Sequence, residues 1–411
     1  MAKAKRKDKN GYVLRTGECQ RADGRYSFSM TDRDGIRHSV YARNIVVLRE
    51  REKELIRDLD DGLDATSAAR MTLNDLYDRY MGQKFDLKAT TKSNYIYTYN
   101  HFVRKTFGNR KIADIKYSDV KKFYYHLLTD EGLKPNTLDN VHTQLHPAFK
   151  LAIREGLLRT NPTDDVMAEI KRSKLWNVPK RRALTIPQQK ALMNFLSEHI
   201  EWRGWLPIVT VLLGTGMRIG ECLGLTWDDV DFEKRFISVN HNLTDRPVGP
   251  EHKCERHIQT PKTEAGTRLI PIVDEVMDAF LLEYQIQKCI GFCEEEVDGY
   301  SGFIFCTSEH KAYQAPAVNQ ALHRATDAYN EQERAAAKLE GREPLIIPSF
   351  SAHNLRHTFC TRLCENESNL KVIQDIMGHA DIQTTMDIYA ECTTEKKQEV
   401  MTNLQGKIII K

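Results

Sequence analysis

The sequence has no apolar run long enough to cross a membrane. Its most apolar stretch, around Trp205–Met217, is short and interrupted by glycine, whereas a membrane-spanning helix needs about 20 apolar residues. The N-terminus is basic, but no apolar segment follows it, so no secretory signal is expected. We therefore expect a cytoplasmic protein without a membrane partner.

Cysteine is also sparse and irregularly spaced. The nine cysteines among 411 residues are an odd number, which does not fit a disulfide framework and indicates reduced thiols. The sequence contains no internal repeat and no low-complexity segment. Because 41% of the residues are hydrophobic and 28% are charged, the composition is that of a folded globular protein.

Neither sign of charge dominates the chain, since the formal net charge is only +3. Segment 1–9 is nevertheless basic apart from Asp8, and segment 171–182 has no acidic residue. Such runs suit a polyanion, because a Lys or Arg on each phosphate releases a counterion. A solvated tail and a solvated linker would explain them equally well. The basic residues of the second run are Lys171, Arg172, Lys174, Lys180, Arg181 and Arg182.

The first part of the chain predicts a small sheet backed by a helix. Residues 11–42 include alternating apolar and polar positions, with Tyr26, Phe28 and Met30 on one face. A helix with one apolar face follows from about Asn44. This pattern predicts a three-stranded sheet plus one helix.

Residues 72–160 predict only helices. Thr72 and Asp75 have the spacing of a capping box at the start of the first helix. The dipeptide Asn161-Pro162 is expected to end the last helix, because the residue before proline avoids the helical conformation.

From Thr185 onward, the pattern mixes helices and strands. A buried helix is expected at Trp205–Met217, and strands at 236–240 and 268–272 flank the polar stretch 241–259. Since domains commonly have about 100–200 residues, we predict three. They are an α+β domain at 1–65, an all-α domain at 70–170 and a mixed α+β domain with a C-terminal tail at 183–411, with 171–182 as the basic linker.

The last domain contains residue types suited to chemistry on a phosphodiester. Without a metal, this chemistry needs cations on the phosphate oxygens, a nucleophile and an acid for the leaving group. Each candidate alone is more often a surface or core residue, so the specificity lies in their order along the chain. They are Arg218 among glycines, Lys262 in a tight turn, His353 and Arg356 one helical turn apart, His379 after a glycine, and Tyr389 on a short helical stretch.

At these positions the sequence resembles the tyrosine recombinases, also called phage-type integrases. The resemblance lies in Thr215–Glu221, His353–Phe359, Gly378–His379 and Tyr389. It covers roughly 185–395 strongly. Segment 72–170 is similar to the core-binding domain of this family, and segment 11–62 to the arm-binding domains of conjugative-transposon integrases.

The resemblance implies that Arg218 and Arg356 clamp the scissile phosphate. Two guanidinium groups can bind its oxygens in a planar, charge-assisted geometry. Tyr389 would attack the phosphorus and hold the strand as a 3′-phosphotyrosine. Since the covalent link conserves the bond energy, religation would need neither ATP nor a metal cofactor.

The same resemblance implies roles for the remaining three residues. Lys262 would protonate the leaving 5′ oxygen, while His353 and His379 would hydrogen-bond the phosphate. His353 is also placed to help proton transfer. There are two mild departures from the family pattern: Gly266 stands where many relatives have Ser, and the insert 241–259 before Lys262 is long. The second departure affects the assignment of Lys262 most.

Metal chemistry is the alternative to weigh. One helical stripe carries His353, His357, Cys360 and Cys364, and such ligands suit zinc. However, the helical rise separates its ends by about 16 Å, so core packing is favoured. Cys289 and Cys293 have no nearby partners in the sequence. The acidic groups Asp228-Asp229-Asp231 and Glu294–Glu296 could serve a two-metal nuclease, but solvated faces are favoured.

The function expected from this sequence is integration and excision of a mobile element. A resolvase-type recombinase with the same chemistry and a non-catalytic DNA-binding regulator are the alternatives. The implied partners are double-stranded DNA with core-type and arm-type sites, further copies of the chain in a tetramer, and an excisionase or host DNA-bending protein at the bacterial nucleoid. The last two domains would form a C-shaped clamp.

The tail 391–411 is expected to form a short helix at 395–404 and an added strand at 407–411. Three consecutive Ile residues near the end need an apolar partner. Docking within the same protomer is the simpler alternative, and we predict docking on a neighbouring protomer in the DNA-bound assembly.

Overall fold

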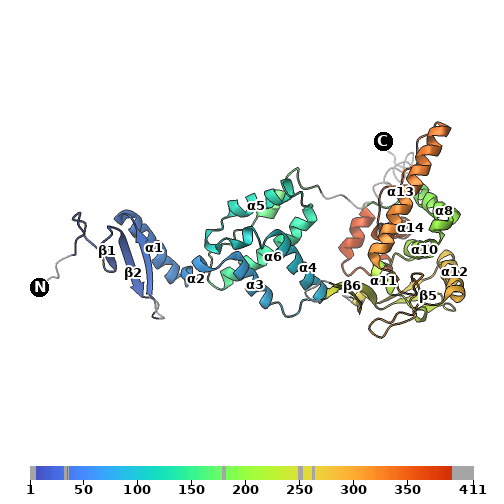
Figure 1. Ribbon diagram of the computed structural model, residues 1–411, viewed down its shortest axis with the longest axis horizontal. Helices are drawn as coiled ribbons and strands as arrows, with labels where there is room; N and C mark the ends of the chain where they lie inside the picture. The colour runs from blue at the N-terminus through green and yellow to red at the C-terminus, as the bar shows by residue number, and fades with distance from the viewer. Residues whose placement is uncertain are drawn as a thin grey trace, which may run out of the picture. The chain divides into compact units, whose positions relative to one another are not determined.

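The computed structural model describes residues 6–31, 35, 37–177, 182–248, 253–261 and 264–390. The chain divides into two compact units, Met1–Pro179 and Lys180–Lys411. Figure 1 shows the elements of each unit.

The first unit opens with the expected small sheet and helix. Tyr26 and Phe28 are buried on one face of the middle strand, and Leu48 and Leu55 of the following helix pack with them. Asn44 caps this helix by accepting a hydrogen bond from the Val47 amide. The antiparallel sheet has the order β1 (Glu18–Gln20), β2 (Tyr26–Thr31) and β3 (Arg37–Ala42), and the helix is α1 (Ile45–Asp60).

The remainder of the first unit is helical, as predicted. Thr72 and Asp75 form the expected capping box, and Tyr77 stacks on Tyr99 with ring centroids 3.5 Å apart in the core. The helices are α2 (Ala65–Arg70), α3 (Leu73–Gly82), α4 (Ala89–Phe102), α5 (Tyr117–Thr129), α6 (Pro135–Arg154) and α7 (Val166–Lys171), with short 3-10 turns η1 (Phe107–Asn109) and η2 (Ile112–Asp114).

The predicted end of the last helix was wrong. Helix α6 stops at Arg154, before Asn161-Pro162, and α7 follows the proline. Asn161 instead organises the loop, because its side-chain oxygen accepts hydrogen bonds from Thr163. Lys171 is the last residue of α7, where we had placed the start of the basic linker.

The second unit combines helices with two small sheets. Its strands are β4 (Val230–Asp231), β5 (Phe236–Val239), β6 (Asn242–Val248), β7 (Lys253–Gln259) and β8 (Arg268–Pro271), and its 3-10 turns are η3 (Trp227–Asp229) and η4 (Glu264–Gly266). The helices are α8 (Ile186–Glu198), α9 (Ile200–Arg203), α10 (Leu206–Thr215), α11 (Ile219–Gly224), α12 (Asp274–Ile290), α13 (Ala315–Glu340), α14 (Ala352–Asn366) and α15 (Leu370–Met377).

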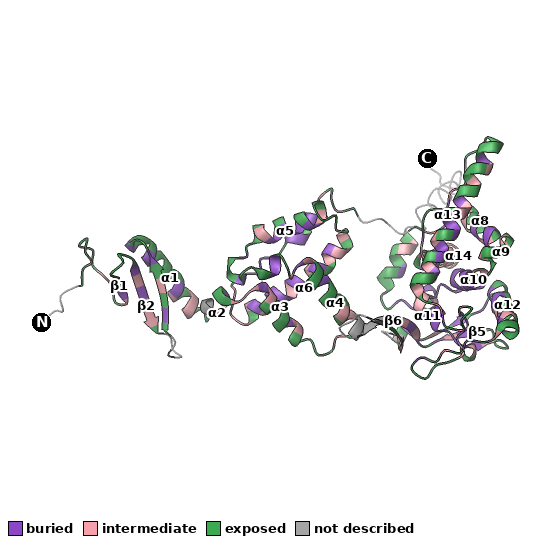
Figure 2. Ribbon diagram, viewed as in Figure 1, coloured by how far each residue is buried: buried purple, intermediate pink, exposed green. Residues whose placement is uncertain are grey.

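Helix α10 is the centre of the second unit. It is almost wholly buried (Figure 2), and it packs against α12 and α14. Gly216 ends it in the left-handed conformation, with φ 63°. A Cβ at Gly216 would lie 2.3 Å from the Phe359 ring, so only glycine allows this turn, which leads directly to Arg218.

Two features of the second unit were not predicted. The polar stretch 241–259 contains two strands, since β6 and β7 pair as an antiparallel two-stranded sheet separate from the β4-β5-β8 sheet. Helix α12 was not expected at all. Its buried positions include Ala279 and Gln287 beside Val276 and Phe280, so its apolar stripe is weak in the sequence.

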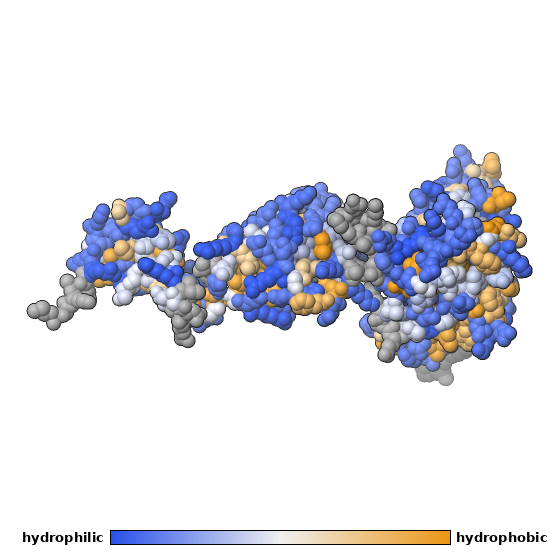
Figure 3. Space-filling model, turned by 60° about the horizontal axis from the view of Figure 1, so that its bottom comes forward, coloured by the Kyte–Doolittle hydropathy of each residue, from blue (hydrophilic) through white to orange (hydrophobic). Residues whose placement is uncertain are grey.

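The described residues include no helix long and apolar enough to span a bilayer. Figure 3 agrees with this finding, because the face shown is mostly hydrophilic with scattered apolar residues.

Candidate active site

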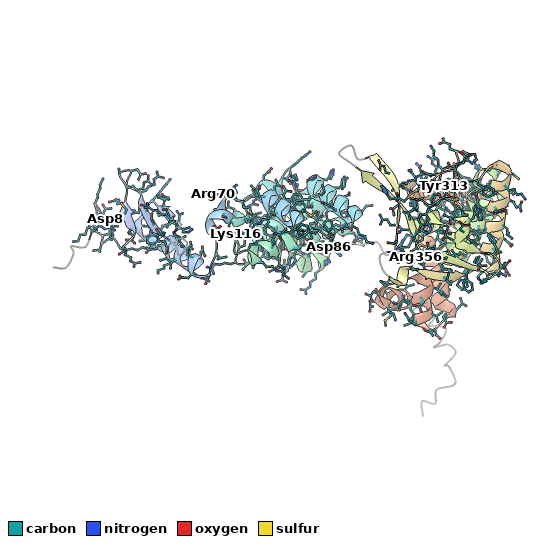
Figure 4. All side chains as sticks on the ribbon, turned by 90° about the horizontal axis from the view of Figure 1, so that it is seen from below. Asp8, Arg70, Asp86, Lys116, Tyr313 and Arg356 are labelled. Carbon is teal, nitrogen blue, oxygen red and sulfur yellow. The ribbon has the colours of Figure 1, made fainter. Side chains whose placement is uncertain are left out.

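Arg356 is the most deeply placed of the candidate residues. It lies in the first part of α14, whose start Ser351 caps, and its exposed fraction is 3%. One Nη donates to the Gly216 carbonyl and the other to the Met377 carbonyl, each at 2.6 Å. Arg356, labelled in Figure 4, therefore joins the ends of α10 and α15.

Arg218 is the N-cap residue of α11 and is more open to solvent. Its side chain is 43% exposed. Its Nη1 donates to Glu221 at 2.6 Å, and its Nη2 donates to the Gly378 carbonyl at 3.1 Å. Glu221 also accepts from the Arg218 amide at 2.9 Å. The guanidinium is thus held on one side and leaves surface for a ligand on the other.

A third arginine, Arg268, completes the group. It starts β8, and its side chain is only 5% exposed. It donates to Glu221 at 2.9 Å, to the Ile376 carbonyl at 2.8 Å and to the Gly266 carbonyl at 3.1 Å. Glu221 is therefore shared between Arg218 and Arg268.

The charges in this group do not balance. Three arginines surround the single carboxylate of Glu221, an excess of two positive charges. Burial, and then the neighbouring Arg218 charge, lower the pKa of Arg356 to about 9. Burial alone would raise the pKa of Glu221, but the hydrogen bond and charge of Arg268, followed by the charge of Arg218, hold this pKa below its ordinary value. An anion bound here would be stabilised by the excess charge.

His379 lies next to the arginines in the turn after α15. It is 7% exposed, and its Nδ1 is 2.9 Å from the Thr385 hydroxyl. Burial, followed by the charges of Arg356 and Arg218, lowers the pKa of His379 to about 4. The imidazole is therefore neutral near pH 7 and can offer a hydrogen bond without adding charge. His353 also influences this pKa, while its own side chain is exposed.

Tyr389 lies on the helical stretch expected for it, residues 382–390. The side chain is half-buried and packs against the hydrophobic cluster of Cys360, Cys364, Ile373 and Met377. This cluster joins α14 and α15, which carry Arg356 and lead to His379. The two cysteines are buried in this cluster.

Comparison with known proteins shows what this arrangement belongs to. The model of the phage integrase family matches residues 182–396, a SAM-like domain model of phage integrases matches 72–170, and the DNA-binding domain of Tn916 integrase matches 2–59. The transposase of Tn916 from Enterococcus faecalis is 32% identical over 97% of this chain and 96% of its own length.

The chain belongs to the phage integrase family. It is a tyrosine-type site-specific recombinase of the conjugative-transposon kind, acting in integration and excision. Among solved structures, Tn1549 integrase in complex with transposon right end DNA is 29% identical, with TM-score 0.70, over 82% of this chain and all of that one. The N-terminal α+β part, the helical part and the mixed C-terminal part of this chain each match one of the three models named above.

Some of the other candidate residues of the integrase lie outside the described residues. Lys262, Lys180 and Arg181 lie outside them. Lys171 forms an ion pair with Asp139 at 3.0 Å. Arg172, Lys174 and Arg182 are exposed.

Sequence reasoning did not assign Glu221 and Arg268 to the site of the integrase. Glu221 had a usable signal, because an acid three residues after an N-cap residue fits a capping box, and the structure forms one. Arg268 had none, since a basic residue at the start of a strand is ordinary.

One smaller interpretation was also wrong for this integrase. Asp229 does not lie on a solvated face, because it is buried and accepts hydrogen bonds from the Thr226 amide and hydroxyl. Cys293 has partners that are distant in the sequence. Its thiol donates to the His310 carbonyl at 3.2 Å, and the hydrogen bond of Cys306 lowers the pKa of Cys293 to about 7.

Proposed function

We propose that this recombinase cleaves DNA by attack of the Tyr389 hydroxyl on a phosphodiester bound by Arg218 and Arg356. The observation that supports this most strongly is the surplus of positive charge around the single carboxylate of Glu221, with part of Arg218 open to solvent. Such a site stabilises an anion, and most strongly a transition state in which charge on the phosphate grows.

The proposed reaction exchanges one ester for another. A bond forms between Tyr389 Oη and phosphorus, the bond between phosphorus and the 5′ oxygen breaks, and a 3′-phosphotyrosine remains. The 5′ oxygen takes a proton from Lys262. His353 helps to remove the tyrosine proton, and neutral His379 hydrogen-bonds the phosphate. Attack by a 5′ hydroxyl from another strand reverses these steps and rejoins the DNA.

The element-level function rests on the relatives. They include transposases of Tn916 and Tn1545, and Tn1549 integrase has been solved with circular intermediate DNA. We infer that this chain integrates and excises an element of the same kind. The matching N-terminal domain favours this role over a resolvase, and the full set of candidate residues favours it over a non-catalytic regulator.

Cleavage is expected to persist in excess EDTA. Arginine side chains perform the charge stabilisation for which two-metal nucleases use Mg²⁺. The measurement is incubation with element-end DNA, followed by denaturing electrophoresis that retains a covalent protein–DNA adduct. A strict requirement for an added divalent ion in strand cleavage itself would overturn the assigned chemistry.

The finer partners are part of the same proposal. The N-terminal domain would bind arm-type sites and the helical domain core-type sites, with the exposed Arg172, Lys174 and Arg182 on DNA phosphates. Four protomers would assemble on two DNA sites, with an excisionase or DNA-bending protein directing excision.

The tail 391–411 lies outside the described residues, and its role is inferred from the sequence. Deleting 406–411 is expected to leave single-site binding unchanged and to reduce strand exchange between two sites about tenfold or more, because the Ile residues would no longer bury their apolar surface on a neighbour. Gel-shift and two-plasmid recombination assays measure the two steps. Recombination at the full-length rate would show that the tail has no such role.

A further inference from the structure

Three consecutive carbonyl groups end α15, and each accepts a hydrogen bond from a different arginine. Ile376 accepts from Arg268, Met377 from Arg356, and Gly378 from Arg218. The last carbonyls of a helix have no partners within the helix and carry its negative partial charge. The end of α15 is therefore a shared support for all three guanidinium groups.

Arg268 differs from Arg218 in its surroundings. Its side chain is 5% exposed, against 43% for Arg218. Its described hydrogen bonds all go to protein groups, which are Glu221 and the carbonyls of Ile376 and Gly266. Arg356 is equally buried, but its described hydrogen bonds go to two backbone carbonyls, whereas Arg268 also pairs with the Glu221 carboxylate. The charge of Arg268 is thus already engaged within the protein, and this arginine can act through its neighbours.

The hydrogen bonds of Arg268 join the separate parts of the site. Through Glu221 it holds Arg218 on α11, and through Ile376 it holds the turn that carries His379. Arg268 begins β8, shortly after the 3-10 turn η4. The carbonyl of Gly266, the last residue of η4, accepts its third hydrogen bond.

The fit around Arg268 is tight. Gly378 has φ +62°, and a Cβ there would lie 2.8 Å from Arg268 Nη1 and 2.9 Å from the Ala265 carbonyl. The turn between α15 and His379 therefore closes directly over the guanidinium, and a side chain at Gly378 would displace one or the other.

We propose that Arg268 is a positioning residue for strand cleavage, setting the spacing between Arg218 and the Met377–His379 turn that also holds Arg356. This inference rests on the proposed function, in which Arg218 and Arg356 bind the scissile phosphate. Arg268 holds the other arginines in the geometry that stabilises the transition state, and it makes no contact with DNA itself.

The test is Arg268→Met, assayed by single-turnover cleavage on two DNA substrates. One has the ordinary scissile phosphate, and the other has a methylphosphonate, in which a methyl group replaces one charged oxygen. On phosphate, we expect about a 10²–10³-fold loss, the size typical of removing one stabilising donor. On methylphosphonate, the loss should shrink to about tenfold or less. The scissile group then lacks one charged oxygen, so its transition state depends less on stabilisation by the arginines. DNA affinity should stay unchanged.

A purely structural role predicts a different pattern. General damage to the domain would lower cleavage of both substrates by the same factor, and that result would overturn the proposal. Cleavage of the phosphate substrate at the wild-type rate would overturn it as well. The matched control is Arg235→Met, because Arg235 pairs with Asp274 at the surface, away from the site.

Arg268→Met leaves Glu221 with one fewer buried partner, so folding is checked with a second variant. Glu221→Gln with Arg268→Gln removes both charges together and keeps hydrogen-bonding side chains. We expect it to show the same contrast between substrates, and equal losses on both would overturn the proposal. Failure of the wild-type integrase to form any adduct would instead reject the proposed function.

Discussion

Tyr389→Phe is expected to abolish the covalent protein–DNA adduct and leave DNA binding intact. The ring of Tyr389 packs against the α14–α15 cluster, and phenylalanine preserves that packing. Only the hydroxyl that would attack phosphorus is lost. Removal of a nucleophile with no substitute lowers the rate by more than about 10⁴-fold, so the adduct should fall below detection in a denaturing gel, while a gel shift shows the wild-type affinity.

Tyr313→Phe provides the matched control, because it also removes one hydroxyl from the same unit, at a ring that packs on Trp205. This variant should form the adduct at the wild-type rate. An adduct that persists in Tyr389→Phe, and that mass spectrometry maps to another residue, would show that Tyr389 is not the nucleophile.

Arg218→Lys is expected to slow single-turnover cleavage about 10²–10³-fold. Lysine keeps the positive charge but cannot hold Glu221 and the Gly378 carbonyl while presenting a planar pair of donors to phosphate. Because the charge remains, DNA affinity should fall only slightly. The rate is measured with saturating enzyme, so that binding and chemistry are separated.

A surface arginine of similar exposure serves as the control for this substitution. Arg342 is 42% exposed and pairs with Glu333 and Glu340 on α13. Arg342→Lys should leave cleavage within about twofold, as is usual for a surface change away from a site. If Arg218→Lys cleaves as fast as this control, then Arg218 does not clamp the phosphate.

Local sequence patterns determined most of the elements. The alternation around Phe28 is set by residues two positions apart in the chain, and the capping box spans only the four residues Thr72–Asp75. The motifs around Arg218, Arg356 and Tyr389 identified the family for a similar reason, since each motif is short and their order is readable along the chain. Where the pattern was weak, as in α12, no helix was predicted.

The arrangement of the site was decided by tertiary structure alone. Arg268 meets Glu221 across 47 positions and Ile376 across 108, and Arg356 meets Gly216 across 140. No local preference encodes such pairs, because they form only when packing of the apolar α10 brings α11, α14 and the end of α15 together. The sequence by itself predicted which side chains bind and cut a phosphodiester. The tertiary structure determined which buried charges and helix ends hold them, because burial makes each charge depend on partners distant in the chain.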